Sequence, residues 1–381
     1  MTQLPTRSSL RARASRVLAL TGATAVALTA CSLGGSNDTD PTSGSTTSDA
    51  AAVEAGSCTG DGALTILTHE SFVLSDEAKT SFEKETGCTL KVVTAGDAGL
   101  LTNRLVLTKN SPVADAVFGI DNTFAGRAVS EGVLEAYEPE LPDGAADHAL
   151  PGDGARVLAP VDFGDVCVNI DDTWFAKEKV DPPVTLDDLT KPEYKDLFVT
   201  PGASSSSPGL AFLLATVAAK GEEGDGGWQQ YWRDLMDNGT KITSGWSDAY
   251  GVDFTAGEGQ GDRPIVLSYA SSPPFTVPEG GSKPTTSALL ETCFRQVEYA
   301  GVVKGTKQPA GARAFVDLML SEDVQAGIPE SMYMYPASSA VELPEEWARW
   351  AKTAEQPLTV DPATIEEQRE TWLREWTDIT S

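Results

Sequence analysis

Histidine and basic residues are both scarce in this sequence. The 381 residues include two histidines, His69 and His148, which excludes a metal site built mainly from histidine ligands. There are 28 Lys and Arg against 56 Asp and Glu, giving a formal net charge of −28 at pH 7. Because such a negative surface repels a phosphate backbone, we expect no nucleic-acid partner. No nucleophile-elbow, phosphate-loop or metal motif is found, and we expect a protein that is not an enzyme and needs no metal or cofactor.

The first thirty residues have the composition of an export signal. Four arginines between residues 7 and 16 precede a small apolar stretch, residues 17–30, that lacks acids and is short for a membrane span. Leu28-Thr29-Ala30-Cys31 matches the lipobox that precedes a lipid-modified cysteine; an ordinary cleavage site with Cys31 there by chance is the alternative. We predict a signal peptide at 1–30, lipidation of Cys31 and a flexible Ser/Thr/Gly-rich tether at 31–61. The lipid would anchor the protein to the outer face of the cell membrane.

Four further cysteines predict two disulfides, because an even number in an exported chain is typical of bridged pairs. Cys58 precedes one apolar run, residues 63–67, and Cys88 precedes the next, residues 90–93. If these runs are parallel neighbouring strands, both cysteines lie at the same sheet edge. Cys167 and Cys293 lie inside two longer strand-like segments. We predict the pairs Cys58–Cys88 and Cys167–Cys293.

Strand-like and helix-like segments alternate from residue 64 onward. Strands expected at 64–67, 90–93 and 114–119 are separated by helical segments, which predicts a parallel α/β sheet covered by helices. Ligands bind beyond the carboxyl ends of such strands. Thr68-His69-Glu70 and Asp121-Asn122 both follow strands, so we expect them to converge.

Three aromatic residues lie at element ends between residues 244 and 275. Trp246 lies between Gly and Ser, Tyr269 lies in a Ser/Pro-rich loop after a strand, and Phe275 follows two prolines. Packing in the core is one interpretation of these rings, and a clamp around a flat ligand is the other. Serines 204–207, followed by Pro208 and Gly209, open an apolar helix and predict either an anion site or a solvated loop with a helix cap.

Several short runs resemble the extracytoplasmic thiamine-binding proteins of ATP-driven uptake systems, within the type 2 periplasmic solute-binding group. The resemblance extends from about residue 64 to the end of the chain. Its most specific runs are Gly245-Trp246-Ser247-Asp248-Ala249-Tyr250-Gly251 and Leu267-Ser268-Tyr269 with Ser272-Pro273. The other matching runs are Ser71-Phe72, Gly119-Ile120-Asp121-Asn122, Asp162-Phe163-Gly164, Ser206-Ser207-Pro208-Gly209, Gln296-Val297-Glu298 and Met334-Tyr335-Pro336.

The resemblance implies a set of ligand-binding residues. His69, Trp246 and Phe275 would enclose thiamine with Asp121 facing it, and Tyr269 and Ser206 would be polar contacts toward the hydroxyethyl or phosphate end. The family usually has Tyr where this chain has His69 and Phe275; both changes keep a flat ring and remove a hydroxyl. Two further acids, Glu70 and Asp165, are candidates for the ligand's positive charge.

The resemblance also implies an α/β fold of two lobes joined by a two-strand hinge. We expect lobe 1 at 62–162 plus 299–381, lobe 2 at 171–292 and hinge strands at 163–170 and 293–298. The implied function is a monomeric receptor that captures thiamine or its phosphates for an ABC permease and its ATPase.

Other functions remain open at this point. A ferric-ion receptor of the same fold would use two adjacent tyrosines, whereas Tyr269 stands alone after its strand. A polyamine receptor would also need acids and aromatic rings. A secreted glycosidase-like enzyme would use paired carboxylates such as Asp121 and Asp165.

Overall fold

A computed structural model describes residues 57–222 and 226–381. The predicted signal peptide, the lipidation of Cys31 and most of the predicted tether lie outside the described residues. Within the described ranges, no helix has both the length and the apolar character needed to cross a membrane.

One mixed sheet runs through the described part of the chain, which confirms the α/β prediction. Its order is β2-β1-β3-β10-β5-β8-β6-β7, and three short strands pair with the central strands β5 and β10. Parallel pairing joins β1 to β2 and β3 in one half and β6 to β7 and β8 in the other. The main strands are β1 (Ala63–Thr68), β2 (Thr89–Thr94), β3 (Ala116–Asp121), β5 (Ala159–Asp171), β6 (Phe198–Pro201), β7 (Lys241–Thr243), β8 (Ile265–Tyr269) and β10 (Phe294–Val303), and the short ones are β4 (Leu134–Glu135), β9 (Thr286–Ala288) and β11 (Tyr335–Pro336).

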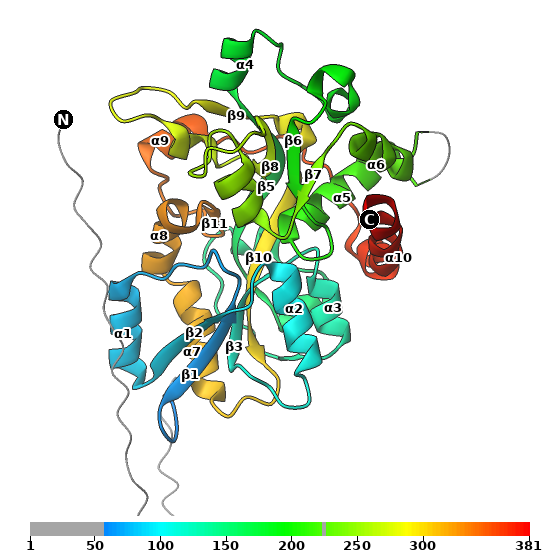
Figure 1. Cartoon of the computed structure of the whole chain (residues 1–381). Coiled ribbons are helices and arrows are strands. Elements are labelled where there is room, and N and C mark those ends of the chain that lie inside the picture. The colour runs from blue at the N-terminus through cyan, green and yellow to red at the C-terminus, as the bar shows by residue number, and fades with distance from the viewer. Residues whose placement is uncertain (1–56, 223–225) are drawn as a thin grey trace, which may run out of the picture. The chain divides into compact units, whose positions relative to one another are not determined.

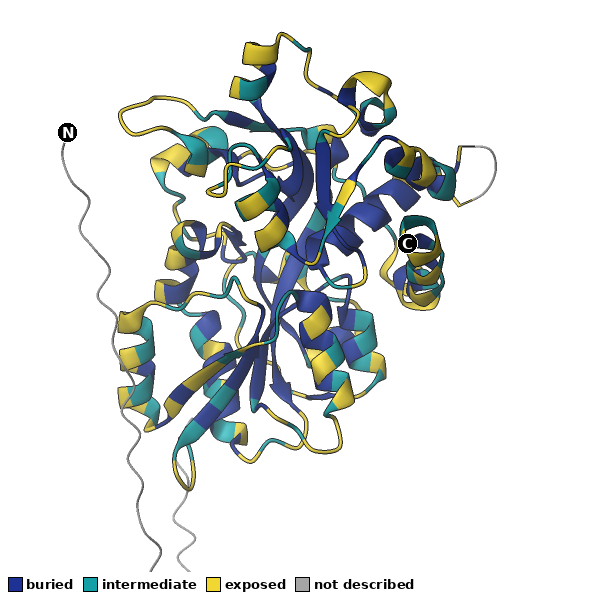
Figure 2. Cartoon of the chain, viewed as in Figure 1, coloured by how far each residue is buried: buried dark blue, intermediate teal, exposed yellow. Residues whose placement is uncertain are grey.

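Two long antiparallel strands, β5 and β10, connect the two halves of the sheet. In Figure 1, β10 runs from the half that carries β1 and β3 toward the half that carries β6 and β8. Both strands are buried along nearly their whole length (Figure 2), although they carry polar side chains, among them the acids Asp162, Asp165 and Glu298. They coincide with the two extended segments predicted from the sequence.

Helices cover the sheet in both halves. In the half with β1, helices α1 and α7 lie on one side of the strands and α2 and α3 on the other (Figure 1). Helix α1 begins after Ser75, because the Ser75 hydroxyl accepts from the Ala78 amide at 3.1 Å and caps the helix. The helices are α1 (Asp76–Thr86), α2 (Ala98–Leu107), α3 (Ala125–Ser130), α4 (Asp172–Glu178), α5 (Ser207–Lys220), α6 (Trp228–Asp237), α7 (Pro309–Met319), α8 (Glu322–Met332), α9 (Glu345–Trp350) and α10 (Pro362–Thr380).

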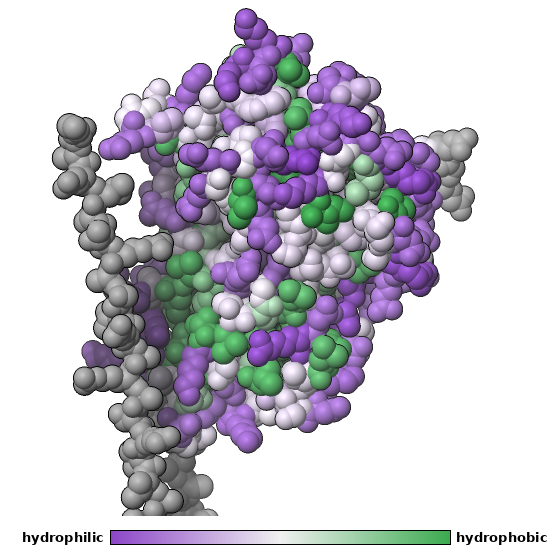
Figure 3. Space-filling view, in the orientation of Figure 1, coloured by the Kyte–Doolittle hydropathy of each residue, from purple (hydrophilic) through white to green (hydrophobic). Residues whose placement is uncertain are grey.

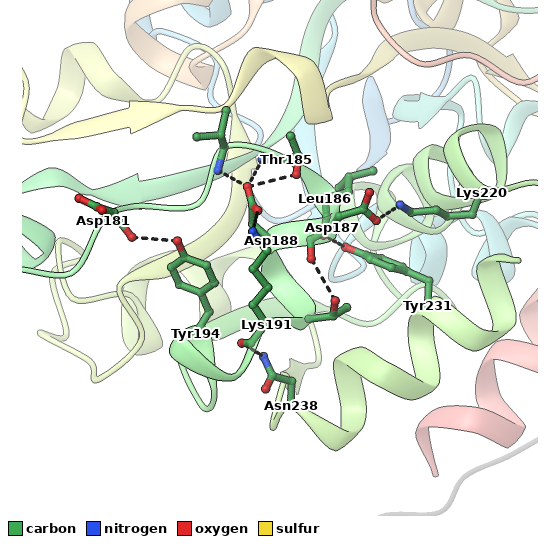
Figure 4. A network of polar contacts seen from close by, with 12 residues as sticks. Asp181, Thr185, Leu186, Asp187, Asp188, Lys191, Tyr194, Lys220, Tyr231 and Asn238 are labelled. Carbon is green, nitrogen blue, oxygen red and sulfur yellow. Dashed lines mark hydrogen bonds and ion pairs between the residues drawn. The ribbon is translucent and has the colours of Figure 1, made fainter. Parts of the chain in front are cut away.

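Short helical turns complete the other half. A 3₁₀ turn, η3 (Leu186–Thr190), begins with a capping box in which Thr185 and Asp188 satisfy each other's backbone amides. The Lys191 ammonium, together with the amides of Val184 and Thr185, holds the pKa of Asp188 below its usual range (Figure 4). The Tyr231 hydroxyl donates to the Leu186 carbonyl at 2.7 Å, which fixes this turn on α6.

Both predicted disulfides are confirmed, and the first one shortens the predicted tether. Cys58 is bridged to Cys88 and Cys167 to Cys293. The amide of Thr59, next to Cys58, donates to the Gln308 side chain at 2.8 Å. Because the bridge and this hydrogen bond hold residues 58 and 59 against the fold, the flexible tether predicted at 31–61 is wrong for its last residues.

The predicted lobe boundaries remain a prediction, but the packing of the C-terminal helix differs from the predicted lobe assignment. Residues 299–381 were all expected in lobe 1. Instead, α10 lies beside α6, where the Trp376 ring meets Trp232 edge-to-face at 5.5 Å, and it also contacts α3. The apolar face of α10 is therefore shared between segments assigned to both lobes.

Gly119, in β3, allows the first residue after β1 to pack closely against the sheet. Its φ is +97°, and a Cβ at this position would lie 2.0 Å from Cδ2 of the His69 ring. The His69 ring also contacts the Phe118 ring, with centroids 5.4 Å apart. A side chain at residue 119 would therefore displace His69.

The two disulfides close loops of different length, which predicts different stabilising effects. Cys58–Cys88 spans 30 residues and Cys167–Cys293 spans 126. Replacing the second pair by serine is expected to lower the free energy of unfolding by about 1 kcal/mol more than replacing the first pair, because a longer loop constrains the unfolded chain more. Urea unfolding of the two double variants measures this difference, and a larger loss for the Cys58–Cys88 variant would contradict it.

The packing of His69 over Gly119 predicts a severe effect of Gly119→Ala. The change is expected to destabilise the protein by about 3 kcal/mol, because it combines a left-handed backbone with a steric clash. Gly132→Ala is the matched control, since φ is +61° there and a Cβ would meet nothing within 4 Å. The control should cost about 1 kcal/mol, and equal losses in thermal unfolding would show that His69 does not restrict residue 119.

A candidate ligand site lined by carboxyl groups and aromatic rings

A cavity of about 230 Å³ opens where the strand ends of the two halves meet. Segments after β1, at the start of α2, in β10 and at the end of α8 form one side, since α8 packs in the same apolar core as β1. The start of α5, the residue before η5 (Ser247–Asp253) and the end of β8 form the other. The lining residues are His69, Glu70, Ser71, Asp97, Ser207, Pro208, Trp246, Tyr269, Glu298, Ser331, Met332, Tyr333 and Met334.

Two of the predicted aromatic residues line this cavity and are held in place by hydrogen bonds. The indole N–H of Trp246 donates to the Ser268 hydroxyl at 3.0 Å, and its ring stacks on Tyr250 with centroids 5.0 Å apart. The Tyr269 hydroxyl donates to the Gln296 side chain at 3.1 Å. These contacts preorganise two rings whose planes are inclined at 61° and whose centroids are 6.4 Å apart.

The charged side chains on the cavity wall are acids, apart from His69. Glu70, Asp97 and Glu298 line it, and among the described residues no lysine or arginine does. Three carboxyl groups around a small space with aromatic walls favour a cationic guest.

Asp97 joins the two halves across this cavity. It caps α2 through the Ala98 amide at 2.7 Å. The same carboxylate accepts from the amide of Ser207, at the start of α5, at 3.2 Å and from the Trp246 amide at 3.3 Å. This residue was not predicted, although it follows β2 as His69 follows β1, so the rule that placed His69 could also have found Asp97.

Glu298 lies deeper in the wall, beside two other titratable groups. Its Oε2 is 3.5 Å from Nε2 of His69, and in the sheet it is paired with Asp162 of β5. Burial, reinforced by the charge of Glu298, raises the pKa of Asp162 well above its usual value. Burial acts in the same direction on Glu298, but the neighbouring His69 and hydrogen bonds to the carboxylate, one of them from Gln296, together outweigh it and lower the pKa of Glu298. Asp162 therefore keeps its proton while Glu298 is ionised.

Asp121 lies behind the cavity wall rather than on it. Its carboxylate accepts from the hydroxyls of Ser207 and Thr123 and from the Phe124 amide at 3.1 Å. Burial raises its pKa to about 7, although these hydrogen bonds oppose the shift. The predicted direct contact of Asp121 with a ligand stays a prediction, and the structure places Ser207 between Asp121 and the cavity.

The two other predicted contacts also lie outside the cavity lining. Ser206 is the buried N-cap of α5 and accepts from the Gly209 amide at 3.4 Å. Phe275 is 39 % exposed and packs on Tyr333, with ring centroids 3.8 Å apart. Tyr333, which the sequence did not single out, holds the wall position expected for Phe275.

The remaining acid candidate has a structural partner. Asp165 accepts two hydrogen bonds from the Arg295 guanidinium, at 2.8 and 2.9 Å, and one from the Ala354 amide at 2.7 Å. It is fully buried and does not line the cavity, so the pairing of Asp121 with Asp165 as catalytic carboxylates has no common site here.

The start of α5 decides between the two interpretations of the serine-rich loop. The Ser207 amide donates to Asp97 and the Gly209 amide to Ser206, while Pro208 has no amide hydrogen. These amides already have acceptors and Ser206 caps the helix, but Ser206 and Ser207 are buried, so this part of the loop is not solvated as that interpretation expected.

The described residues contain no cluster of side chains suited to binding a metal ion. Across residues 57–222 and 226–381, no three His, Cys, Asp or Glu side chains are grouped as a metal ion would require.

The chain is similar in sequence to proteins of one transport family. Residues 111–354 match the family model described as bacterial extracellular solute-binding protein. The thiamine-binding periplasmic protein of Brucella melitensis is 31% identical over 326 residues, 84% of this chain and 92% of that protein. The thiamine-binding periplasmic protein of Escherichia coli is 30% identical over 322 residues, 82% of this chain and 92% of its own length.

Solved structures agree with the sequence comparisons. A periplasmic thiamin-binding protein superposes with a TM-score of 0.71 at 30% identity, over 84% of this chain and 96% of that one. An iron-bound HitA from Pseudomonas aeruginosa shares the fold alone, with a TM-score of 0.60 at 20% identity over 84% of this chain and 99% of that one. The predicted type 2 periplasmic-binding-protein fold is thus confirmed, as is the prediction of a binding protein rather than an enzyme. The chain belongs to the bacterial extracellular solute-binding proteins, in the family of the thiamine-binding periplasmic proteins.

Proposed function

We propose that this protein is an extracytoplasmic receptor that captures thiamine and delivers it to an ABC permease. The observation that carries the proposal is the cavity itself, in which three carboxyl groups and the rings of Trp246, Tyr269 and Tyr333 form the wall. The names of the relatives support the same ligand.

The chemistry of thiamine fits this wall. Thiamine carries a permanent positive charge on a flat thiazolium ring, next to an aminopyrimidine. A cation over an aromatic face gains roughly 0.5–2 kcal/mol, and more where water is excluded. Glu70, Asp97 and Glu298 supply the opposite charge and can accept from the exocyclic amine.

We further propose that thiamine binds better than its phosphates. A phosphate group would add negative charge to an acidic wall. The amides at the start of α5, which would otherwise form the natural phosphate site, donate to Asp97 and Ser206 instead.

The cellular setting follows from the sequence prediction and the relatives. We propose a monomeric protein held to the outer face of the cell membrane by lipid on Cys31, with a permease and its ATPase as partners. The acidic surface suits an extracytoplasmic protein, and Figure 3 shows hydrophilic residues over much of the visible face with apolar residues in smaller groups.

Calorimetric titration tests the ligand assignment. Thiamine is expected to bind 1:1 and more tightly than thiamine monophosphate, thiamine diphosphate, spermidine or ferric ion. Trp246→Ala should weaken thiamine binding by about 10–100-fold, because it removes one aromatic face, and Asp121→Asn should weaken it less. Trp174→Phe, in α4 and outside the cavity wall, is the matched control and should bind as the unaltered protein does.

Two results would contradict the proposal. Tighter binding of ferric ion or spermidine would assign the receptor to another ligand. Unchanged thiamine affinity in the Trp246→Ala protein would show that the ring of Trp246 does not hold the ligand.

A further inference from the structure

His69 and Glu298 form a charge pair on the inner wall of the cavity. The two side chains are almost completely buried, and their nearest atoms, Nε2 and Oε2, are 3.5 Å apart. Gly119 makes this position possible, because any larger residue would collide with the His69 ring. Both residues line the cavity in which thiamine is proposed to bind.

Acidic groups face this pair from β3, β5, the start of α2 and the segment after β1, and the Tyr269 hydroxyl of β8 also lies near Glu298. Glu298 comes from β10 and Asp162 from β5, and neither oxygen of Asp162 has a hydrogen-bond partner within the described part of the chain. Asp97 at the start of α2 and Glu70 beside His69 add further negative charge, and Asp121 of β3 lies near Glu298. Burial alone would lower the pKa of His69, but Glu298, Asp97 and Glu70 together raise it.

The two ring nitrogens of His69 have different roles. Nδ1 accepts from the Ser71 amide at 3.1 Å, so the neutral ring carries its hydrogen on Nε2, toward Glu298. A second proton must enter at Nδ1 and displace the Ser71 amide, which also belongs to a cavity-lining residue. Protonation of His69 therefore changes both the charge and the shape of the wall.

We propose that Glu298 receives the positive charge of the ligand and that a proton on His69 competes with the ligand for it. The inference rests on the proposed cationic ligand. Below the pKa of His69 in the empty site, its imidazolium neutralises Glu298. A thiazolium in the cavity takes over that role and repels the imidazolium, which releases its proton to solvent. His69 thus makes capture of the vitamin dependent on pH, a property that Tyr at this position would not confer.

The sign of the effect follows from linkage. The free protein binds the proton more tightly than the complex does, so ligand binding releases protons between the two pKa values of His69. In this window, affinity is expected to rise about tenfold per pH unit. It should level off above the raised pKa of His69, where the imidazole is already neutral.

Proton release can be counted by calorimetry. Thiamine titrations at about pH 6, in two buffers with different ionisation enthalpies, should show release of up to one proton per ligand. His69→Tyr keeps a flat ring and is expected to release almost none. Asp121→Asn is the control for the other group that titrates near neutrality, and it should keep most of the release.

Imidazole NMR of the unaltered protein provides a test that needs no variant. The chain has two histidines, so His69 and His148 give two imidazole signals. The His69 signal should titrate above the usual range in the free protein and shift to lower pH when thiamine is added. In the Glu298→Gln protein without ligand, it should titrate at lower pH than in the unaltered protein.

The outcomes separate the two proposals. Absence of thiamine binding at every pH would contradict the proposed function and also the competition between the proton and the ligand. The titrations of the free protein would still show whether the charge of Glu298 raises the pKa of His69. Tight binding with no proton release, or equal release in the His69→Tyr protein, would overturn the inference and leave thiamine capture intact.

Discussion

The crossing of β5 and β10 is the constraint on which the rest of the structure depends. These strands join the two halves of the sheet, and their pairing sets Glu298 opposite Asp162 in a buried position. Two carboxyl groups so placed cannot both ionise at low cost, so one retains its proton and the other needs a positive partner. The strands that connect the two halves therefore place an ionised carboxylate where it is stable only beside a positive charge.

The residues around this crossing add selectivity for a flat ligand. Trp246 and Tyr269 are fixed by hydrogen bonds to Ser268 and Gln296, so a flat guest would meet rings that need little reordering. Asp97 bonds to amides on the opposite side and holds the cavity walls together. The acidic groups and the aromatic rings of the cavity wall thus come from segments that are far apart in the sequence.

Local patterns were enough to predict much of the fold, but not the details of the site. Strand–helix alternation located the main strands, and two cysteines at the start of neighbouring parallel strands correctly gave the Cys58–Cys88 bridge. Position after a strand indicated His69 and Glu70, which line the cavity, and also Asp121 and Asn122, which do not. The same reasoning could not rank acids: whether Asp121, Asp97 or Glu298 faces the cavity depends on side-chain partners from distant elements. Tyr333 lies at the end of α8, where no local signal indicates a site, and the packing of α10 depends on contacts with Trp232 that sequence spacing does not reveal.

The central claim is that the cavity selects a permanent positive charge, not only a flat shape. The most direct measurement is a comparison of the affinities for thiamine and for a neutral analogue of the same shape, in which a thiophene ring replaces the thiazolium. At a pH where His69 is neutral, thiamine is expected to bind about 10–100-fold more tightly, since the analogue leaves the carboxylates of the wall without a partner. Equal affinities for the two molecules would contradict the account.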